Sequence, residues 1–426
     1  MKLKQELEAR WFLHQYTHEE LFDIYEKWGE KLYWWIDPSA DSFQLGNFIS
    51  LLNALNVMKR WNKLYLIVWW ATGMIGNPTW KDAERNFLTA EQVEENARKI
   101  EAQIHVILKN VSDKIGVKLE VEVVNNLKFF KNLNVLDFMR EVGKYMTVNW
   151  MMNKDIVKKR ITDPDKSISY AEFSYMLIMG YDFYKLYTEN GVRLEVWWSD
   201  EWDGILSGVE LTGKKTWQTV YGMTNKLITD STWRKFWKSE WNAIWLDPTK
   251  NSPYFVYQYL LNCSDEDVEK LLKLLTFMDL DEIEEITKKH LAEPELRYWQ
   301  KQLANYTTEI IFWKKASNQA EMISDMLFWN KDKLEILKTL TKDDLEALAK
   351  ETGSTNFTSW LIILDALINS WLASSRWDGR KLIEWGWIYL NETKVTDWFA
   401  EITDGDFINS AIILRKWKKN FKLVLR

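Results

Sequence analysis

Two lysines and a serine lie close together in the stretch STWRKFWKSEWNAIWLDP, residues 231–248. Lys235 and Lys238 are three residues apart and Ser239 follows, which is the arrangement expected of a loop that neutralises a triphosphate. Such loops usually contain glycine, because the backbone must approach the phosphates closely and adopt left-handed conformations. Indoles stand there instead, at Trp233, Trp237 and Trp241. The stretch has the charges of a phosphate-binding loop without its small residues.

A second cationic pair, Lys81 and Arg85, has the i, i+4 spacing that puts two side chains on one helical face. Taken alone, either pair is more often a solvated surface pair than a phosphate site. The four histidines lack ligand spacing, and the single cysteine, Cys263, excludes a disulfide framework. We therefore expect no metal centre and no prosthetic group, and a reducing compartment, the cytoplasm.

The composition of the whole chain shows the same excess of tryptophan over glycine as residues 231–248. The chain of 426 residues has 27 Trp and 16 Gly, whereas average usage predicts roughly 30 Gly in a chain of this length. The net charge is −6, and no apolar run reaches the length of a membrane span. We expect no membrane contact and two or three domains.

Strand-like and helix-like segments alternate over residues 1–230. Three apolar runs have strand length, KLYWWI (31–36), KLYLIVWW (63–70) and RLEVWW (193–198), and each ends in a double Trp or soon after one. Between them lie long amphipathic patterns such as residues 88–111, where Thr89 can cap a helix and Gln92 lies three residues on. The alternation predicts a mostly parallel sheet with helices on both faces, whose ligands bind at the carboxyl ends of the strands.

Helical patterns dominate from residue 247 to about 330, and a charged stretch then leads to a compact tail with two helices and short strands. The last dozen residues contain no acid and six bases: Arg415, Lys416, Lys418, Lys419, Lys422 and Arg426. A basic strand ribbon on an acidic protein suggests an RNA backbone as partner. The alternative is an edge strand guarded by lysines.

Six ordered segments, distributed over essentially the whole chain, carry a resemblance. They are LYWWIDPSADSFQLGNF (32–48), ATGMIGNPTWKDAERNFLT (71–89), FSYMLIMGYDF (173–183), WWSDEWDGILSG (197–208), KFWKS (235–239) and LASSRWDGRKLIEWGWIYLN (372–391). Together they resemble the motifs of bacterial tyrosyl-tRNA synthetases, which are class I enzymes. In that family the first and fourth read approximately Y-x-G-F-D-P-T-A-D-S and G-G-S-D-Q-W-G-N-I.

Tryptophan stands at eight positions where the family pattern resembles glycine: Trp35, Trp69, Trp70, Trp80, Trp197, Trp198, Trp237 and Trp387. Trp202 and Trp245, by contrast, resemble tryptophans that the family does carry. Some bacterial lineages read UGA as glycine, whereas a common alternative code reads it as tryptophan. We hypothesise that these positions are UGA codons and hold glycine in the native protein. UGG codons at these positions would contradict the hypothesis.

The resemblance implies a two-step reaction, in which tyrosine and ATP, with Mg²⁺, form tyrosyl-adenylate, and the tyrosyl group then passes to tRNA. Lys235 and Lys238 would meet the β and γ phosphates, and Lys81 and Arg85 the leaving pyrophosphate. The other implied ATP-binding residues are Asp37, Ser39, Gln44, Gly46, Asn47 and Ser239. Gln44 stands where histidine is usual, and we expect its neutral amide to donate the same hydrogen bond.

For tyrosine itself the resemblance implies two sets of contacts. Tyr33 and Asp182 would hydrogen-bond the phenol hydroxyl, which also argues against tryptophan as the substrate. The ammonium contacts would be Asn77, Tyr175 and Met179, but Asn77 replaces an aspartate and Met179 a glutamine. Glu201 replaces a glutamine in the fourth motif, and we hypothesise that it supplies the negative charge lost at position 77. The alternative is a decayed pocket.

The predicted fold is α/β: a Rossmann-type catalytic domain with a parallel sheet (1–232), the signature lysine loop with a helical anticodon-binding domain (233–330), a linker (331–355) and a small α+β RNA-binding domain (356–426). The expected partners are tRNA, tyrosine and ATP, without DNA. A homodimer is also implied, with its interface at residues 125–152. The rival function is a noncatalytic RNA-binding paralogue, which the changes at Gln44, Asn77 and Met179 favour.

Overall fold

The computed structural model describes residues 1–27, 29–68, 88–163, 167–226, 243–326, 333–357, 361–417 and 420–426. They form two compact units. Unit 1 contains residues 1–252 and 259–313, and unit 2 contains residues 253–258 and 314–426.

Unit 1 is built on a six-stranded sheet with the order β1-β6-β5-β2-β3-β4. Its strands are β1 (Gln15–Tyr16), β2 (Lys31–Ile36), β3 (Lys63–Val68), β4 (Val121–Asn125), β5 (Leu194–Trp198) and β6 (Tyr221–Asn225). All neighbours are parallel except β1 and β6. The parallel strands thus have the order of a doubly wound sheet, in which the direction of winding reverses between β2 and β5. The predicted parallel sheet is confirmed.

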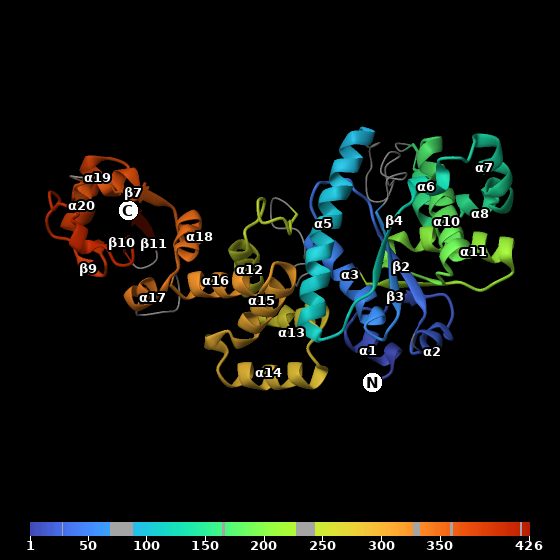
Figure 1. Ribbon diagram of the computed structural model, residues 1–426, viewed down its shortest axis with the longest axis horizontal. Helices are drawn as coiled ribbons and strands as arrows, with labels where there is room; N and C mark the ends of the chain where they lie inside the picture. The colour runs from blue at the N-terminus through green and yellow to red at the C-terminus, as the bar shows by residue number, and fades with distance from the viewer. Residues whose placement is uncertain are drawn as a thin grey trace. The chain divides into compact units, whose positions relative to one another are not determined.

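Helices cover both faces of this sheet (Figure 1): α3 (Leu45–Met58) and α5 (Ala90–Ile115) lie on one side, and α10 (Tyr170–Asn190) and α11 (Trp202–Thr216) on the other. The predicted cap at Thr89 is confirmed, because its hydroxyl accepts a hydrogen bond from the backbone N–H of Gln92 at 3.2 Å. The strands are near-continuous apolar runs because both of their faces are covered. Residues 32–36 of β2 and 64–68 of β3, for example, are buried throughout.

The other elements of unit 1 are short connections and a helical region. The connections are α1 (Leu3–Ala9), α2 (Leu21–Tyr25), α6 (Leu127–Phe130), α7 (Val135–Glu141), η1 (Gly143–Tyr145), α8 (Val148–Met152), α9 (Asp155–Ile161) and η2 (Ser199–Glu201). The helical region contains α13 (Asp265–Leu275), α14 (Leu280–Ala292), η3 (Pro294–Leu296) and α15 (Tyr298–Ile311). Helix α12 (Pro253–Leu261) spans the change from unit 2 back to unit 1.

Unit 2 is α+β, with a five-stranded sheet in the order β7-β11-β10-β8-β9. The strands are β7 (Ser354–Asn356), β8 (Ile388–Leu390), β9 (Thr393–Lys394), β10 (Ala411–Lys416) and β11 (Asn420–Leu425). The helices are α16 (Lys314–Ser324), α17 (Lys333–Thr339), α18 (Lys342–Thr352), α19 (Ile363–Asn369), α20 (Arg376–Glu384) and η5 (Asp404–Asp406). The predicted helix pair and strand ribbon of the tail are therefore present.

The described part of the predicted linker, residues 333–355, belongs to the packed body of unit 2. Helices α17 and α18 bury Leu337, Leu345 and Leu348 in one core with Ile413 and Leu423 of the sheet. The high charge of this stretch conceals apolar residues at helical spacing, which form one buried stripe.

Among the described residues, six tryptophans have left-handed backbones: Trp11, Trp61, Trp217, Trp313, Trp371 and Trp417, with φ between 58° and 146°. Their indoles are 46% to 90% exposed. Several follow a helix directly, and Trp217 ends α11 with φ 60° just as Gly116 ends α5 with φ 66°. Left-handed backbone costs a residue with a Cβ about 1 to 2 kcal/mol, which glycine avoids. The fold therefore places tryptophan where glycine is the favoured residue.

We predict that Trp217→Gly raises the free energy of unfolding of the full-length chain by about 1 kcal/mol, through relief of the left-handed strain. Trp217→Ala keeps the Cβ and should give no such gain. Trp299→Gly should lower it by about 3 to 5 kcal/mol, because that indole is buried, stacks on His290 and donates to Thr287. Chemical denaturation measures all three. Equal effects of glycine and alanine at position 217 would contradict the argument.

Candidate functional site

The candidate site lies at the carboxyl ends of β2 and β5, where the winding of the sheet reverses. The β2 and β5 strands are neighbours, with Tyr33 opposite Glu195. Helix α3 begins just beyond β2, after Gln44, so its positive end is at the same edge of the sheet. Open α/β sheets bind their ligands at this position.

Tyr33 and Asp182, the predicted contacts of the phenol hydroxyl, are both buried, and Tyr33 packs against the residue that follows Asp182 on α10. Tyr33 is 1% exposed and Asp182 is fully buried on α10. The Tyr33 ring packs edge-on against Phe183, with ring centroids 5.0 Å apart. Asn126 Nδ2 donates to Asp182 Oδ2 at 2.9 Å, whereas Asp182 Oδ1 is buried without a hydrogen-bond partner. The carboxyl therefore keeps one acceptor oxygen for a donor.

A second buried carboxyl, Glu195 on β5, completes the polar cluster. Trp35 Nε1 donates to Glu195 Oε1 at 2.9 Å, and the Tyr33 hydroxyl also hydrogen-bonds this carboxyl. Burial raises the pKa of Glu195 to about 7, although both hydrogen bonds act to lower it. Burial also raises the pKa of Asp182 well above its ordinary value, and the charge of Glu195 adds to that rise, while the Asn126 hydrogen bond opposes it. The two acids share one dry environment.

The predicted ammonium contacts lie partly on the same helix face. Tyr175 and Met179 are buried on α10, spaced i and i+4, with Asp182 three residues further on. Glu201 is also buried, in η2. A Cβ on Gly204 would lie 2.5 Å from Met179 Sδ and 3.8 Å from Glu201 Oε2, so both side chains reach the same spot. The acid thus lies beside the residue that replaces the expected glutamine.

The predicted ATP residues in the described part of the chain follow β2 and open α3. Asp37 is partly buried and Ser39 is exposed, whereas Gly46 and Asn47 form the first turn of α3. Gln44 precedes this turn and pairs as an isolated bridge with Trp245. The remaining predicted site residues lie outside the described residues: Asn77, Lys81, Arg85, Lys235, Lys238 and Ser239.

Indoles occupy the strand ends. Trp35 and Trp197 stack with ring centroids 4.2 Å apart, and Trp34 lies 4.7 Å from Trp197. Trp35, Trp197 and Trp198 are at most 6% exposed. These rings fill the space directly beyond Tyr33, on the two strands that flank the reversal point. A ligand bound there would have to displace them.

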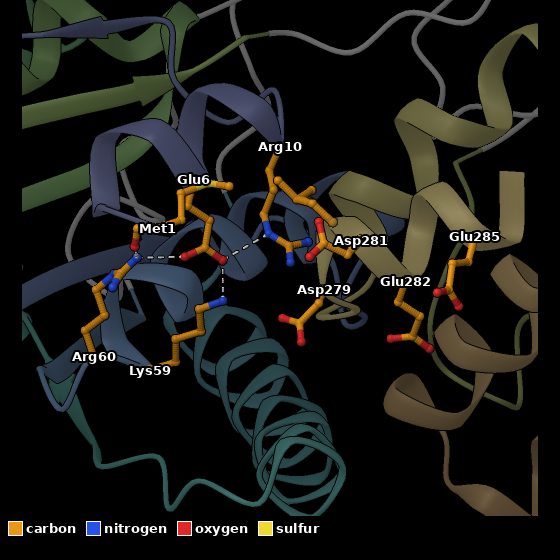
Figure 2. Close-up of a pocket in the computed structure, with 10 residues that line it drawn as sticks. Met1, Glu6, Arg10, Lys59, Arg60, Asp279, Asp281, Glu282 and Glu285 are labelled. Atoms are coloured by element: carbon orange, nitrogen blue, oxygen red, sulfur yellow. Dashed lines mark hydrogen bonds and ion pairs between the residues drawn. The ribbon is translucent and has the colours of Figure 1, made fainter.

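A cavity of about 610 Å³ lies elsewhere in unit 1 (Figure 2), beside the carboxyl end of α3, which is the amino-terminal edge of the parallel strands. Glu6 holds three cations on one wall: Lys59, Arg60 and Arg10. Burial disfavours ionised Glu6, but the hydrogen bond and charge of Lys59, with the two arginine charges, lower its pKa. Arg10 also donates to the Met278 carbonyl, just after α13. We interpret these ion pairs as structural, because they join α1 and α3 to the helical region.

The basic strand ribbon of unit 2 has internal partners. Arg415 makes a two-pronged contact with Glu392, at 3.1 and 2.6 Å. Lys416 donates to the Leu372 carbonyl, Lys422 to the Thr352 carbonyl, and Arg426 pairs with Asp404. Lys418 and Lys419 lie outside the described residues. Part of the positive charge is therefore balanced locally.

Within the described ranges, no helix is long and apolar enough to cross a membrane. The same residues contain no group of three or more His, Cys, Asp or Glu side chains arranged to hold a metal ion.

Two residues of the cluster were missed by sequence reasoning. Glu195 interrupts the apolar run LEVWW, and an acid inside a doubly covered strand is a signal that could have been used. Asn126 follows β4 and carries no comparable signal, because its contact with Asp182 joins residues 56 positions apart.

Comparisons with known proteins agree along the chain. A family model described as tRNA synthetases class I (W and Y) matches residues 29–329, and one described as tyrosine--tRNA ligase SYY-like C-terminal domain matches residues 344–424. The chain is 39% identical over 430 residues to tyrosine--tRNA ligase 1 of Streptococcus thermophilus, covering 99% of this chain and 100% of that protein. It is 37% identical over 435 residues to tyrosine--tRNA ligase of Streptococcus suis, with both chains fully covered.

Among solved structures, the chain resembles a C-terminally truncated mitochondrial tyrosyl-tRNA synthetase of Aspergillus nidulans. The TM-score is 0.69 at 25% sequence identity, and the match covers 77% of this chain and 94% of that one.

Proposed function

Because this chain belongs to the tyrosine–tRNA ligase family of class I aminoacyl-tRNA synthetases, it joins tyrosine to tRNA with ATP as a substrate, and we propose how it recognises tyrosine. In this proposal the phenol hydroxyl of the substrate lies between Tyr33 and Asp182. The side chain of the bound tyrosine then points from the carboxyl ends of β2 and β5 toward the middle of the sheet.

The observation that carries the proposal is the unpartnered Oδ1 of buried Asp182. A buried acceptor without a donor costs about 1 to 3 kcal/mol, more when it is charged. The phenol hydroxyl of tyrosine would supply that donor, and its oxygen would face the Tyr33 hydroxyl. Phenylalanine would leave both groups unpaired, so a site of this kind rejects it strongly.

The amino end of the substrate is proposed to meet Glu201. Its carboxylate lies beside Met179, at the place where the family has a neutral amide on α10. We assign to Glu201 the negative charge that Asn77 lacks, and to Tyr175 a polar contact beside it. Tyrosine and phenylalanine carry the same ammonium group, so this contact contributes equally to both.

ATP is proposed to bind beside α3, whose amino-terminal end favours phosphate. Gln44 would donate to the γ-phosphate, and Asp37, Ser39, Gly46, Asn47 and Ser239 would line the nucleotide. Lys235, Lys238, Lys81 and Arg85 would balance the charge that spreads over the triphosphate during adenylation. Mg²⁺ would enter with ATP, because phosphate oxygens are its usual ligands. We propose a cytoplasmic location, because a chain with the single cysteine Cys263 suits a reducing compartment.

We further propose that the native protein has glycine at the positions where the family pattern resembles glycine and at the six left-handed tryptophans. Two independent observations support this. The motif positions include Trp35, Trp197 and Trp198, whose rings fill the ligand position at the strand ends. The left-handed positions require a backbone that only glycine adopts without strain. A chain with glycine at all of these positions is called the glycine-restored chain below.

In the glycine-restored chain, Asp182→Asn should lower the selectivity for tyrosine over phenylalanine roughly 10- to 100-fold, the worth of one hydrogen bond to a charged group. Glu201→Gln should weaken both amino acids alike and leave the ratio unchanged. Tyrosine-dependent exchange of pyrophosphate into ATP measures kcat/KM for each substrate. An unaltered ratio in Asp182→Asn would overturn the assignment of the hydroxyl site. Absence of exchange with tyrosine in the glycine-restored chain would contradict the proposed glycine positions and the proposed tyrosine site.

The homodimer is proposed to form through residues 125–152. Five apolar side chains there are exposed by 41% to 76%: Val135, Leu136, Met139, Val148 and Met152. Exposed apolar residues gathered on neighbouring short helices are typical of a protein interface. A two-fold dimer would pair this surface with its own copy.

Leu136→Asp should convert the dimer to a monomer at micromolar concentration, because it buries a charge in the proposed interface. Leu291→Asp is the matched control, since Leu291 is 65% exposed on α14, outside residues 125–152. Sedimentation velocity measures both variants. A monomeric unsubstituted chain, or a dimer that tolerates Asp at position 136, would contradict the proposal.

A further inference from the structure

Glu195 lies at the end of a row of hydrogen-bonding groups that starts at Asp182. Glu195 and Tyr33 are opposite each other on adjacent parallel strands, and the Tyr33 hydroxyl hydrogen-bonds the Glu195 carboxyl. Burial raises the pKa of Tyr33, and Asp182, which lies on α10, acts electrostatically on Tyr33 and raises it further. Its Oδ1 atom has no hydrogen-bond partner. The proposed place of the substrate hydroxyl completes the row in the order Asp182, substrate, Tyr33, Glu195.

The row needs more hydrogens than the two hydroxyl groups can supply. It contains three links: Asp182 to substrate, substrate to Tyr33, and Tyr33 to Glu195. Each link needs one hydrogen, and the two hydroxyl groups supply two. With both carboxyls ionised, the hydroxyls donate outward to the two acids, and their oxygens face each other without a hydrogen between them. One proton shared by Asp182 and Glu195 makes all three links, whichever acid carries it.

We propose that tyrosine binding requires one proton on the Asp182–Glu195 pair, and that Glu195 is a positioning residue that makes tyrosine recognition depend on pH. The proposal rests on the proposed tyrosine site. It deepens that site because it assigns a role to an acid that does not touch the substrate. Glu195 would act only through the Tyr33 hydroxyl.

The surroundings favour retention of the shared proton. Glu195 is 1% exposed, and Gly222 lies opposite it on β6. Helix α3, which packs on β5, contains no ionisable residue. The buried face of α11 is also uncharged: Gly204, Ile205, Ser207, Gly208, Leu211 and Thr212. The buried residues of α10 include Asp182 and, elsewhere on the helix, Glu172, Tyr175 and Tyr181. Tyr33 and Asp182 are the titratable groups that interact with Glu195, and no lysine or arginine is buried on α3, α10 or α11. Two like charges at one dry site are disfavoured.

Trp35 does not belong to the row. Its indole donates to Glu195 Oε1, and glycine at position 35 would remove that bond. The three links through Tyr33 remain as described. The loss of this donor would disfavour the ionised form of Glu195 and so favour proton retention.

The direction of the pH effect follows from the raised pKa values. Burial raises the pKa of Glu195 to about 7 and that of Asp182 well above its ordinary value. The pair therefore holds a proton at low pH and loses it as the pH rises through the raised pKa of the acid that carries it. Once the free protein has lost the proton, tyrosine must bind together with one, and its affinity falls up to about tenfold per pH unit.

The test measures the dissociation constant of tyrosine for the full-length glycine-restored chain from pH 6 to pH 9. We expect affinity to be level at low pH and to fall up to about tenfold per unit above the pKa of the pair. Phenylalanine, whose affinity is measured by competition, is the matched ligand. Its ammonium and carboxylate groups titrate like those of tyrosine, but it has no hydroxyl group to join the row. Its affinity should lack this fall.

Glu195→Gln is the decisive variant. Its amide carries a permanent N–H donor, so the third proton is always present and the fall in tyrosine affinity should disappear. Glu122→Gln, at a half-exposed acid on β4 that pairs with Lys63, should keep the fall. An unchanged pH profile in Glu195→Gln, with selectivity still lost in Asp182→Asn, would overturn the role of Glu195 alone. Unchanged selectivity in Asp182→Asn would instead overturn the tyrosine site itself.

Discussion

Burial of two carboxyl groups around one tyrosine hydroxyl is the constraint on which the rest of unit 1 depends. Asp182 and Glu195 are at most 1% exposed, and a buried ion costs several kcal/mol unless polar groups surround it. Asn126 on one side and Tyr33 on the other supply those groups. The register of β2 against β5 fixes Tyr33 opposite Glu195, and α10 fixes Asp182. The sheet and its covering helices thus hold a dry, polar cluster where the side chain of the substrate would end.

Close packing of α10 on α11 keeps this cluster in place. A Cβ on Gly208 would lie 2.6 Å from the Phe183 ring, and one on Gly180 would lie 3.0 Å from the Ser207 carbonyl oxygen. Neither contact leaves room for a larger residue. Phe183 in turn packs on Tyr33, so the helix contact and the hydroxyl row are mechanically linked. Specificity and packing are therefore properties of the same few residues.

Much of the fold could be predicted from the sequence, because long apolar runs and helix caps are local signals. The strands at KLYWWI and KLYLIV and the cap at Thr89 are examples. Long-range partners were harder: Asn126 meets Asp182 only through the tertiary fold. The helices at residues 333–352 were predicted as a linker and not as part of a packed body, because their charged residues outnumber the leucines that they bury.

Tryptophan and glycine make opposite demands on a backbone, and the structure separates the two kinds of position. Trp299 is buried, stacked and hydrogen-bonded, as a real tryptophan should be. Trp217 and Trp371 are about nine-tenths exposed on left-handed backbone, with φ values of 60° and 61°. At the ends of β2 and β5 the tryptophans are buried, and their rings fill the space in which a ligand would bind. The proposed presence of glycine at these positions in the native protein would explain both observations.

Peptide mass spectrometry of the protein purified from its own cells identifies the residue at each of these positions. We expect glycine at positions 35, 197, 198 and 217, and tryptophan at positions 202 and 245 in the same digest. Tryptophan at 35 and 197 in active protein would contradict it, because the stacked rings would then occupy the place assigned to the substrate.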